Sequence, residues 1–368
     1  MACHLQRFIL RWVDPVQPLI LAPASIEPFQ LKFQKPFAFG GNFVTERVGY
    51  YLNLVSTSGL KAQGEAAPLS GVSQETLRKT EHDLKEALTS LNNLQLVPEK
   101  KSLIEQLRHN ETLRELCSSS RFAIESAIFI LAAKANGQSL AGFLGTDLAD
   151  VSSAGLLQGT YDQVMMDAKL MVDHGVDIFK IKVGDRNIPL DVKKVNEIRT
   201  LIGEDGLIRL DGNRVWSLKE ASLFMELVGH KQIEYFEEPL SDISQLNEFY
   251  NRTHIPVALD ETLLTSRCGA TAPGRCSPTL AQHEAVQAYI LKPMILGGII
   301  PTLDWIEEAR STGRKAVISS SFESSVGLKV LANLSLLTGQ VAGLGTSRWL
   351  SGENIVNEQG IILKELLT

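Results

Sequence analysis

The chain has few cysteines for its length of 368 residues: only Cys3, Cys117, Cys268 and Cys276 are present. This scarcity argues against a framework of disulfide bonds and is typical of a reducing compartment. Cys268 and Cys276 share a Gly/Pro-rich stretch, but a zinc site would need two further ligands, and only His283 is near in sequence. We therefore interpret this stretch as a plain loop.

The sequence also lacks the features that attach a protein to a membrane or to nucleic acid. No apolar run approaches the roughly 18 residues that a spanning helix needs. Arg11, Asp14 and two prolines interrupt the N-terminal stretch that otherwise resembles a signal peptide. The net charge is −6, and no block of Lys and Arg occurs. We therefore expect a cytoplasmic protein with neither nucleic acid nor membrane as a partner.

The region from about residue 28 to 67 has the pattern of β-structure. Apolar and polar residues alternate in FQLKFQKPFAF and in VGYYLNLVS, and GLKAQGEAAPL follows a glycine-bearing turn. This predicts a three-stranded antiparallel meander. Leucines at helical spacing from Leu77 to Leu91 then predict a helix with Ser73 as its candidate N-cap, and more helix is expected over about 100–137.

After about residue 150 the pattern changes to strands that alternate with amphipathic helices. The predicted strands are SAGLLQG, VDIFKIKVG, LIRLDGN, QIEYFEEPL, IPVALDET, QAYILKPMI, KAVISSSF and VAGLGT. Eight such units are typical of a (β/α)8-type barrel. No residue signature recurs between the units, which disfavours a solenoid.

Five consecutive predicted strands end their apolar runs with ionisable residues. These residues are Lys180, Lys182, Asp211, Glu237, Asp260 and Lys292. The C-terminal ends of barrel strands form the mouth of the active site, so we expect three carboxylates side by side, flanked by lysines.

Three buried carboxylates would raise one another's pKa and lose hydration, and a divalent cation would resolve this conflict. Carboxylate oxygens suit Mg²⁺. Structural salt bridges are the alternative for any single residue, but the recurrence on consecutive strands favours a metal site.

Lysines beside such a metal suit the removal of a proton next to a substrate carboxylate. That proton is less acidic than an ammonium group by about 20 pKa units, or about 27 kcal/mol. A positioned base contributes only ~10²–10⁴-fold. The metal and the cationic lysines would therefore have to supply much of the rest electrostatically.

The segments KIK, LDGN, EEP, LDET and LKP, in this order, resemble the enolase superfamily, and within it the muconate-lactonizing-enzyme subgroup. The resemblance runs from about residue 28 to the end. It implies an α/β fold: a (β/α)7β TIM-like barrel with an N-terminal α+β capping domain. We expect an N-terminal extension over 1–27, the capping domain over 28–145, the barrel over 146–347, and a C-terminal segment over 348–368 that returns to the capping domain.

Three further motifs, ISSSFESSVGL, GEAAPLSG and RLDGNRVWS, resemble the o-succinylbenzoate synthases more than the epimerases. That resemblance implies a hydro-lyase of menaquinone biosynthesis. Its reaction would be the syn-dehydration of 2-succinyl-6-hydroxy-2,4-cyclohexadiene-1-carboxylate to 2-succinylbenzoate through a metal-stabilised enediolate. Lys182 would remove the α-proton and then protonate the leaving hydroxyl, while Lys292 would lie across the substrate as a cation. Mg²⁺, with Mn²⁺ as a substitute, would be held by Asp211, Glu237 and Asp260.

Supporting roles follow for neighbouring residues. Lys180 would support the substrate carboxylate or lower the pKa of Lys182. Arg209 and Asn213 share the strand face of Asp211 and are expected just behind the metal ligands.

Serines follow the seventh predicted strand and could hydrogen-bond a substrate carboxylate: Ser319, Ser320 and Ser321. An ordinary strand end is the alternative for each of them, and Glu323 could pair with a cation there. Glu237 is preferred to Glu238 as the metal ligand because relatives often carry Gln at the second position.

Two departures from the family pattern leave specificity open. The N-terminal extension has no obvious counterpart, and the loop over 262–281 is longer than expected and could reshape the mouth. The seven histidines fall on predicted helices and loops, so a histidine base is not expected.

Other lysine–lysine enzymes of the subgroup are the alternatives: an N-succinylamino acid racemase, a dipeptide epimerase or a cycloisomerase. Lys182 and Lys292 would also suit racemisation, but GLGTSRWL lacks the Asp-x-Asp element that dipeptide epimerases tend to carry. A non-catalytic barrel that binds a carboxylate is the alternative of a different class. The expected partner is a small-molecule carboxylate substrate, and the sequence predicts no oligomeric state.

Overall fold

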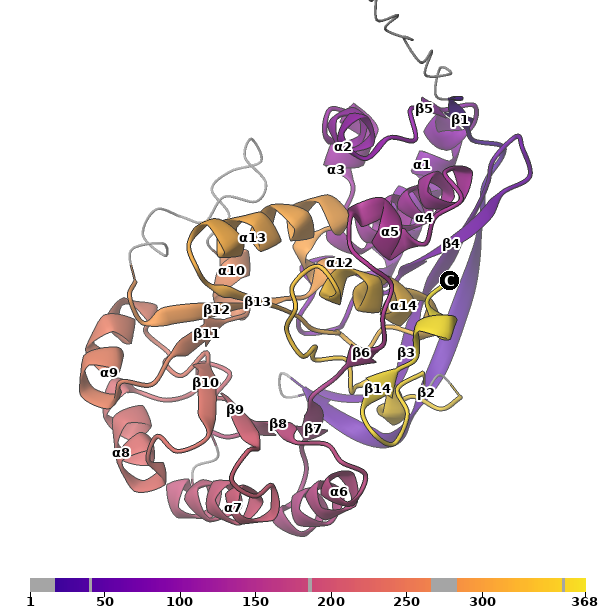
Figure 1. Ribbon diagram of the computed structural model, residues 1–368. Coiled ribbons are helices and arrows are strands. Elements are labelled where there is room, and N and C mark those ends of the chain that lie inside the picture. The colour runs from indigo at the N-terminus through magenta and orange to yellow at the C-terminus, as the bar shows by residue number, and fades with distance from the viewer. Residues whose placement is uncertain (1–16, 40–41, 185–186, 266–282, 353–354) are drawn as a thin grey trace, which may run out of the picture.

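The computed structural model describes residues 17–39, 42–184, 187–265, 283–352 and 355–368 (Figure 1). An antiparallel sheet with its helices forms one part of the molecule, and a curled parallel sheet ringed by helices forms the other. The fold is the predicted one: an α+β capping domain on a (β/α)7β barrel. Within the described residues, no helix is both long enough and apolar enough to cross a membrane.

The capping domain contains the predicted meander. Strands β2 (Ser25–Phe39), β3 (Asn42–Val55) and β4 (Lys61–Ala66) pair antiparallel in the order β2-β3-β4, and β1 (Leu19–Ile20) pairs with β5 (Gln95–Leu96). The helices are α1 (Leu77–Leu91), α2 (Lys100–Arg108), α3 (Glu111–Glu115), α4 (Ser118–Ala135) and α5 (Leu140–Leu144). Helix α4 is apolar around most of its surface, and it is accordingly buried between β4 and the barrel.

The predicted N-cap of α1 is wrong by three residues. Thr76, not Ser73, adopts the extended cap conformation, and its hydroxyl accepts a hydrogen bond from the Lys79 backbone nitrogen at 3.3 Å. The Ser73 hydroxyl instead accepts one from the Leu69 backbone nitrogen at 2.9 Å. Ser73 therefore stabilises the turn that precedes the helix.

The barrel consists of a parallel sheet with helices outside it. Its strands, in the spatial order β7 to β13, are β7 (Gly155–Leu157), β8 (Ile178–Lys182), β9 (Leu207–Asp211), β10 (Ile233–Glu237), β11 (Val257–Leu259), β12 (Val286–Leu291) and β13 (Lys315–Ile318). Its helices are α6 (Tyr161–Asp173), α7 (Ile188–Leu201), α8 (Leu218–Val228), η1 (Ile243–Gln245), α9 (Leu246–Thr253), α10 (Glu261–Thr265), α12 (Pro293–Leu296), α13 (Ile299–Ser311) and α14 (Ser325–Ser335).

The eighth predicted strand, VAGLGT, closes the ring without forming a continuous strand. On one side, the Ala154 nitrogen donates to the Ala342 oxygen at 2.8 Å. On the other side, the Gly343 nitrogen donates to the Ile318 oxygen at 2.8 Å, and the Ser320 nitrogen donates to the Gly343 oxygen at 3.0 Å. The segment thus bridges the two edges of the seven-stranded sheet.

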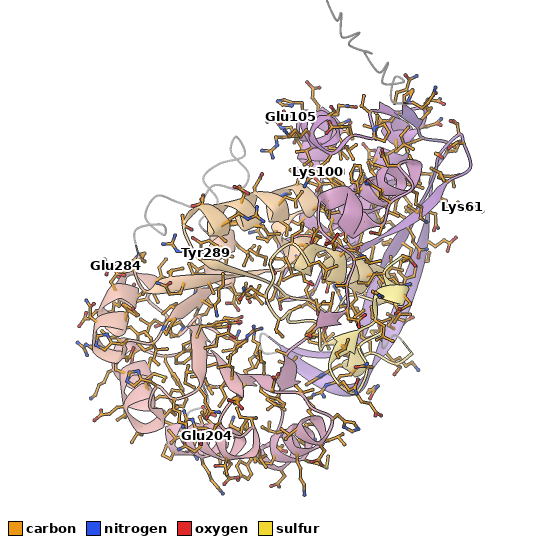
Figure 2. All side chains as sticks on the ribbon, in the orientation of Figure 1. Lys61, Lys100, Glu105, Glu204, Glu284 and Tyr289 are labelled. Carbon is orange, nitrogen blue, oxygen red and sulfur yellow. The ribbon has the colours of Figure 1, made fainter. Side chains whose placement is uncertain are left out.

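Alternation along each strand separates the barrel interior from the helical shell. On β12, Tyr289 points outward and its ring meets that of Trp305 on α13 at 5.1 Å, whereas Ile290 belongs to the small apolar cluster inside the barrel. Figure 2 shows charged side chains such as Glu204 and Glu284 at the outer margin. Residues of one face of each strand therefore share one interior.

The chain continues beyond the barrel and contacts both parts of the molecule. It contains η2 (Ser347–Trp349), β14 (Ile361–Ile362) and η3 (Lys364–Leu366). Strand β14 pairs with β6 (Val151–Ser152), while the Ser351 nitrogen donates to the Lys32 oxygen of β2 at 2.9 Å. This segment therefore joins the barrel to the meander of the capping domain.

Candidate active site

The C-terminal ends of neighbouring barrel strands bring the predicted charges together. The register pairs Lys182 of β8 with Asp211 of β9, and Asp211 with Glu237 of β10. Two residues earlier, Lys180 pairs with Arg209. Residues two apart on a strand share a face. The row of Lys182, Asp211 and Glu237 and the row of Lys180 and Arg209 therefore both point into the barrel.

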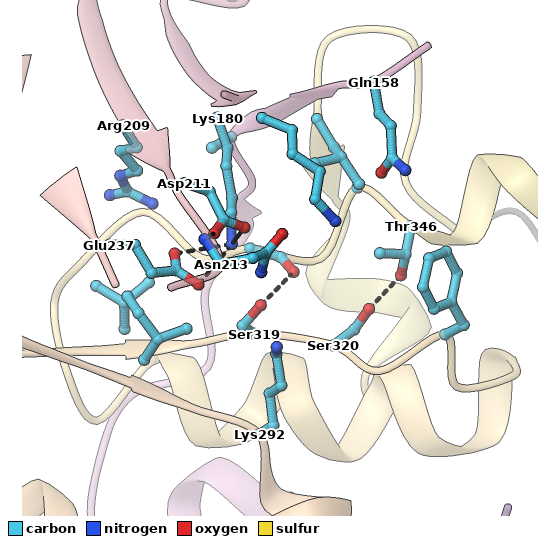
Figure 3. Close-up of a pocket in the computed structure, with 18 of the residues that line it drawn as sticks. Gln158, Lys180, Arg209, Asp211, Asn213, Glu237, Lys292, Ser319, Ser320 and Thr346 are labelled. Carbon is cyan, nitrogen blue, oxygen red and sulfur yellow. Dashed lines mark hydrogen bonds and ion pairs between the residues drawn. The ribbon is translucent and has the colours of Figure 1, made fainter. Parts of the chain in front are cut away.

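A pocket lies at this end of the barrel (Figure 3). Its lining includes most of the predicted site residues: Lys180, Lys182, Arg209, Asp211, Asn213, Glu237, Lys292, Ser319 and Ser320. An adjoining hollow shares Ile290 and Lys292 with the pocket and reaches Asp260. Its outer side is a loop of the capping domain that contains Gly71, Val72 and Gln74. The capping domain therefore closes over the charged strand ends.

The Lys180 ammonium group lies between two carboxylates. Its nitrogen is 2.8 and 2.7 Å from the two Glu237 oxygens and 2.9 Å from Asp211 Oδ2 (Figure 3). Burial by itself lowers the pKa of Lys180, but the charges of Asp211, Glu237 and Asp260 together place that pKa well above its ordinary value. The charged form of Lys180 is therefore favoured, and Lys180 is a poorer proton acceptor than a lysine whose pKa is lowered.

The two acids that Lys180 contacts have opposite pKa shifts. Burial raises the pKa of Asp211, but Lys180 and Lys182 lower it more, so the net shift is downward. Burial and the nearby Asp211 charge place the pKa of Glu237 well above its usual range. Two buried carboxylates repel each other, so each disfavours the ionised form of the other. Further positive charge nearby would offset this repulsion.

Lys182 and Lys292 stand on opposite sides of the pocket. Their strands, β8 and β12, are separated by β9, β10 and β11 in the curled sheet. Burial, together with the Lys180 and Lys292 charges, lowers the pKa of Lys182. Burial also lowers the pKa of Lys292, but the nearby Asp260 raises it more, so it lies above its ordinary value. Lys182 is thus the better proton acceptor, and Lys292 the more persistent cation.

The carboxylates are held by ammonium groups in this structure. Lys180 joins Asp211 to Glu237, and Lys292 donates a short hydrogen bond to Asp260. Within the described ranges, no three carboxylate, imidazole or thiol side chains are already gathered as a metal centre.

The donor set nevertheless fits a hard divalent cation. Glu237 Oε2 is buried and accepts no hydrogen bond of regular geometry from the described residues, although Lys180 Nζ is 2.7 Å away. Asp211, Glu237 and Asp260 offer carboxylate oxygens at the ends of three adjacent strands, as Mg²⁺ prefers. A bound cation would take over the charge compensation that Lys180 and Lys292 supply here.

Glu238 has a different task from Glu237. Its backbone is left-handed, with φ at 43°, and its Oε1 accepts hydrogen bonds from the Asp260 and Thr262 nitrogens at 2.8 and 2.7 Å. Burial raises the pKa of Glu238 to about 7. Glu238 thus fixes the turn that carries Asp260, while Glu237 faces the pocket.

Arg209 is buried at the floor of the pocket. Its Nε donates to Glu234 Oε2 at 2.6 Å, its Nη1 donates to the Val341 oxygen at 2.9 Å, and its guanidinium lies 5.3 Å from the Tyr235 ring centroid. These contacts tie β9 and β10 to the closing segment, so Arg209 supports the pocket from below.

Asn213 lies beside the metal-ligand candidates. Its backbone nitrogen donates to Asp211 Oδ1 at 3.1 Å, and its side-chain amide donates to Glu261 Oε1 at 3.1 Å. The sequence did not single out Glu261, whose Oε2 is buried without a hydrogen bond among the described residues. Its position directly after Asp260 in LDET was the available signal.

The three serines after β13 separate into two groups. Ser319 and Ser320 line the pocket, and the Ser320 hydroxyl forms a short hydrogen bond with the Thr346 hydroxyl. Ser321 is outside the lining, and its hydroxyl donates to Glu323 Oε1 at 2.5 Å. Glu323 therefore binds the turn itself and does not reach the pocket.

The pocket lining also contains uncharged residues that the sequence motifs did not indicate, among them Gln158, Tyr235, Phe322 and Thr346. Gln158 ends the SAGLLQG strand, and Tyr235 precedes Glu237 by two positions, so alternation would have found both. Cys268, Cys276 and most of the long loop over 262–281 lie outside the described residues.

Residues 163–360 match the model of the enolase C-terminal domain-like family. The o-succinylbenzoate synthase of Aliivibrio fischeri (strain MJ11) is 31% identical over 84% of this chain and 85% of its own length. The o-succinylbenzoate synthase of Haemophilus influenzae is 31% identical over 74% of this chain and 73% of its own length. Protein PHYLLO, chloroplastic, of Arabidopsis thaliana is 30% identical over 86% of this chain, which spans only 20% of that protein.

Solved structures share the whole architecture. Dipeptide epimerase from Enterococcus faecalis V583, complexed with Mg and the dipeptide L-Leu-L-Tyr, has a TM-score of 0.81 at 20% identity, over 94% of this chain and 97% of its own. The L-Ala-D/L-Glu epimerase from Bacillus subtilis has a TM-score of 0.78 at 21% identity, over 93% of this chain and 96% of its own. At these identities, the likeness establishes the fold.

Proposed function

Because the chain belongs to the enolase superfamily and is similar to o-succinylbenzoate synthases over most of its length, we propose that it catalyses their dehydration reaction. The substrate would be 2-succinyl-6-hydroxy-2,4-cyclohexadiene-1-carboxylate and the product 2-succinylbenzoate, on the route to menaquinone. The carrying observation is the pair Lys182 and Lys292, which face each other across Asp211 and Glu237 with opposite pKa shifts.

Lys182 is the proposed acid and base. Its neutral amine would accept the proton next to the substrate carboxylate, so that the C–H electron pair moves toward that carboxylate. Lys180 and Lys292 are cations that would offset the negative charge. The Lys182 ammonium would then return the proton to the departing hydroxyl on the same face as the C–O bond breaks. Water leaves, and the ring becomes aromatic.

Asp211, Glu237 and Asp260 would hold Mg²⁺. Bound there, the cation would supply positive charge to the substrate carboxylate and so favour loss of the neighbouring proton. The E. faecalis dipeptide epimerase, which shares this fold, was solved in complex with Mg and a dipeptide. We propose Mn²⁺ as a substitute because its coordination chemistry is close to that of Mg²⁺.

The test is the loss of cyclohexadiene absorbance, followed with Mg²⁺ and then with EDTA. Rapid loss that EDTA abolishes is the expected result. No turnover by a folded protein that binds Mg²⁺ would refute the dehydration.

Racemisation of an N-acylated amino acid is the second candidate, because two opposed lysines could exchange roles and because epimerases share the fold. Incubation in D₂O with N-succinyl amino acids or dipeptides measures exchange of the α-proton. Exchange without dehydration would favour this candidate, whereas a non-catalytic carboxylate-binding barrel would show neither.

We propose a reducing compartment from the scarcity of cysteines, with the cytoplasm as the expected one. The name of the Arabidopsis relative places that protein in the chloroplast. Cell fractionation with an antibody to the chain would distinguish the two locations.

A further inference from the structure

One arginine of the capping domain joins that domain to the wall of the pocket. Arg47, on β3, is only 2% exposed. Its Nη1 donates to the Pro68 oxygen at 2.7 Å, and its Nη2 donates to the Ala67 oxygen, both within the capping domain. Its Nε donates to the Phe322 oxygen of the barrel at 3.0 Å. A single planar guanidinium thus links the two parts of the molecule.

The barrel residue at the end of this link has a strained backbone. Phe322 has a φ of 64°, a left-handed conformation that bulky side chains avoid. It follows the serines that line the pocket, and its own side chain also lines it. Such a conformation persists only where the surroundings hold it.

The Phe322 ring belongs to a separate apolar cluster, here called the roof cluster: Phe33, Leu69, Phe322 and Leu350. The Phe33 ring of β2 meets the Phe322 ring edge-on at 5.3 Å. The roof cluster therefore combines side chains of the capping domain and of the C-terminal segment with Phe322, the one member that also lines the pocket.

Two buried carboxyl groups interact electrostatically with Arg47. They belong to Glu65 and Glu323, which are both fully buried. Glu65, on β4, accepts hydrogen bonds from the Ser324 nitrogen at 3.0 Å and from the Gly327 nitrogen at 2.9 Å. The same segment of the barrel is therefore held twice from the capping domain.

We propose that Arg47 is a positioning residue that keeps Phe322 in its left-handed conformation. It thereby holds segment 319–324, with Ser319 and Ser320, against the pocket, and it presents the Phe322 ring to an apolar ring of the substrate. The nature of the substrate rests on the proposed function, whereas the ordering of the segment does not.

Arg121 provides a matched control. It is also an arginine of the capping domain, its Nε lies 2.7 Å from Glu125 Oε1, and Glu125 is fully buried. Glu125 in turn accepts a hydrogen bond from the Ile300 nitrogen of α13 at 2.8 Å. Arg121 therefore supports the same interface but does not line the pocket.

Hydrogen exchange measured by mass spectrometry on the full chain tests the ordering. In Arg47→Met, amides over 319–327 are expected to exchange roughly 10- to 100-fold faster, because the charge-assisted hydrogen bond to the Phe322 oxygen is lost. Arg47→Lys keeps the positive charge but lacks the planar guanidinium with its several donors, so exchange over 319–327 should be intermediate in rate. Arg121→Met should leave 319–327 protected.

Unchanged protection of 319–327 in the Arg47 variants would overturn the proposal, and so would equal deprotection by Arg121→Met. If Arg47→Met does not fold, as judged by circular dichroism, Arg47→Lys decides.

Kinetics then separate positioning from general stability. Arg47→Lys is expected to raise KM about tenfold while Mg²⁺ affinity stays unchanged. Phe322→Asn tolerates the left-handed backbone but lacks the ring, so it should raise KM and leave 319–327 protected. Wild-type KM in both variants would overturn the role in substrate binding. If the wild-type protein does not dehydrate the cyclohexadiene substrate, the proposed function fails, while hydrogen exchange still decides the role of Arg47.

Discussion

The pocket has two walls that are built in different ways. The charged wall consists of the ends of β8 to β12, where strand register within one sheet sets Lys182, Asp211 and Glu237 in a row. The other wall contains Ser319, Ser320 and Phe322 after β13, and Arg47 and Glu65 of the capping domain form hydrogen bonds to Phe322 and Ser324 of this segment. For the proposed reaction, we expect the barrel to supply the chemistry and the capping domain to adjust the fit of the substrate.

The largest effect is expected when the proposed base is removed from the charged wall. Lys182→Ala should lower dehydration by about 10⁴-fold or more, because one amine would serve as both base and acid. Mg²⁺ affinity, measured by isothermal titration calorimetry, should stay within about twofold of wild type. Lys193→Ala changes an exposed lysine on α7 and should leave activity intact. Substantial activity in Lys182→Ala would contradict the proposed role of Lys182 as acid and base.

The second largest effect is expected from a metal ligand. Asp211→Asn removes a negative charge from the proposed Mg²⁺ site and leaves Lys180 with one acid fewer. We expect Mg²⁺ affinity to fall about 10³-fold, as is typical for the loss of one partner of a buried charge. Asp205→Asn, at an exposed position before β9, is the calorimetric control. Wild-type affinity in Asp211→Asn would contradict the proposed ligand set.

The wall held by the capping domain should show itself in the pH dependence of stability. Burial, and then the Glu323 charge, raise the pKa of Glu65 from 4.5 to about 7. The folded state therefore binds the Glu65 proton more tightly than the unfolded state does. Protonation of Glu65 thus stabilises the folded state at low pH, and this stabilisation is lost as the pH rises toward 7.

The free energy of unfolding of wild type, relative to Glu65→Gln, should thus fall by about 3 kcal/mol between pH 4.5 and pH 7. Urea unfolding at several pH values measures this difference. The control is Glu220→Gln. Glu220 is an exposed residue in the first turn of the barrel helix α8, and its pKa is lowered, so this variant should show no such fall. A pH-independent difference for Glu65→Gln would show that Glu65 is not protonated in the fold.

The smallest effect distinguishes two neighbouring serines. Ser319 lines the pocket, so Ser319→Ala should raise KM about fivefold, the effect of one neutral hydrogen bond. The Ser321 hydroxyl donates to Glu323, so Ser321→Ala should lower stability and leave KM within about twofold. Equal effects of the two substitutions on KM would mean that the segment is disturbed as a whole.

Several local signals in the sequence were sufficient to predict where charged residues lie in the barrel. Alternation predicted which face Lys180 and Lys182 share, and the spacing of about one βα unit predicted that Asp211 and Glu237 lie on adjacent strands. Other local signals were ambiguous. Ser73 and Thr76 are both good N-caps, and the choice depended on the turn at Leu69, where the Ser73 hydroxyl is already engaged.

By itself, the sequence determined the barrel, the meander and the charged strand ends, because a period of two along a strand and a βα repeat are encoded within a few tens of residues. The tertiary structure alone decided that Glu238 binds the turn at Asp260, that VAGLGT closes the ring through two bridges, and that Phe322 is held by Arg47. Arg47 and Phe322 are 275 positions apart. A contact at such separation depends on how the capping domain packs on the barrel, and no periodicity in the chain records that packing.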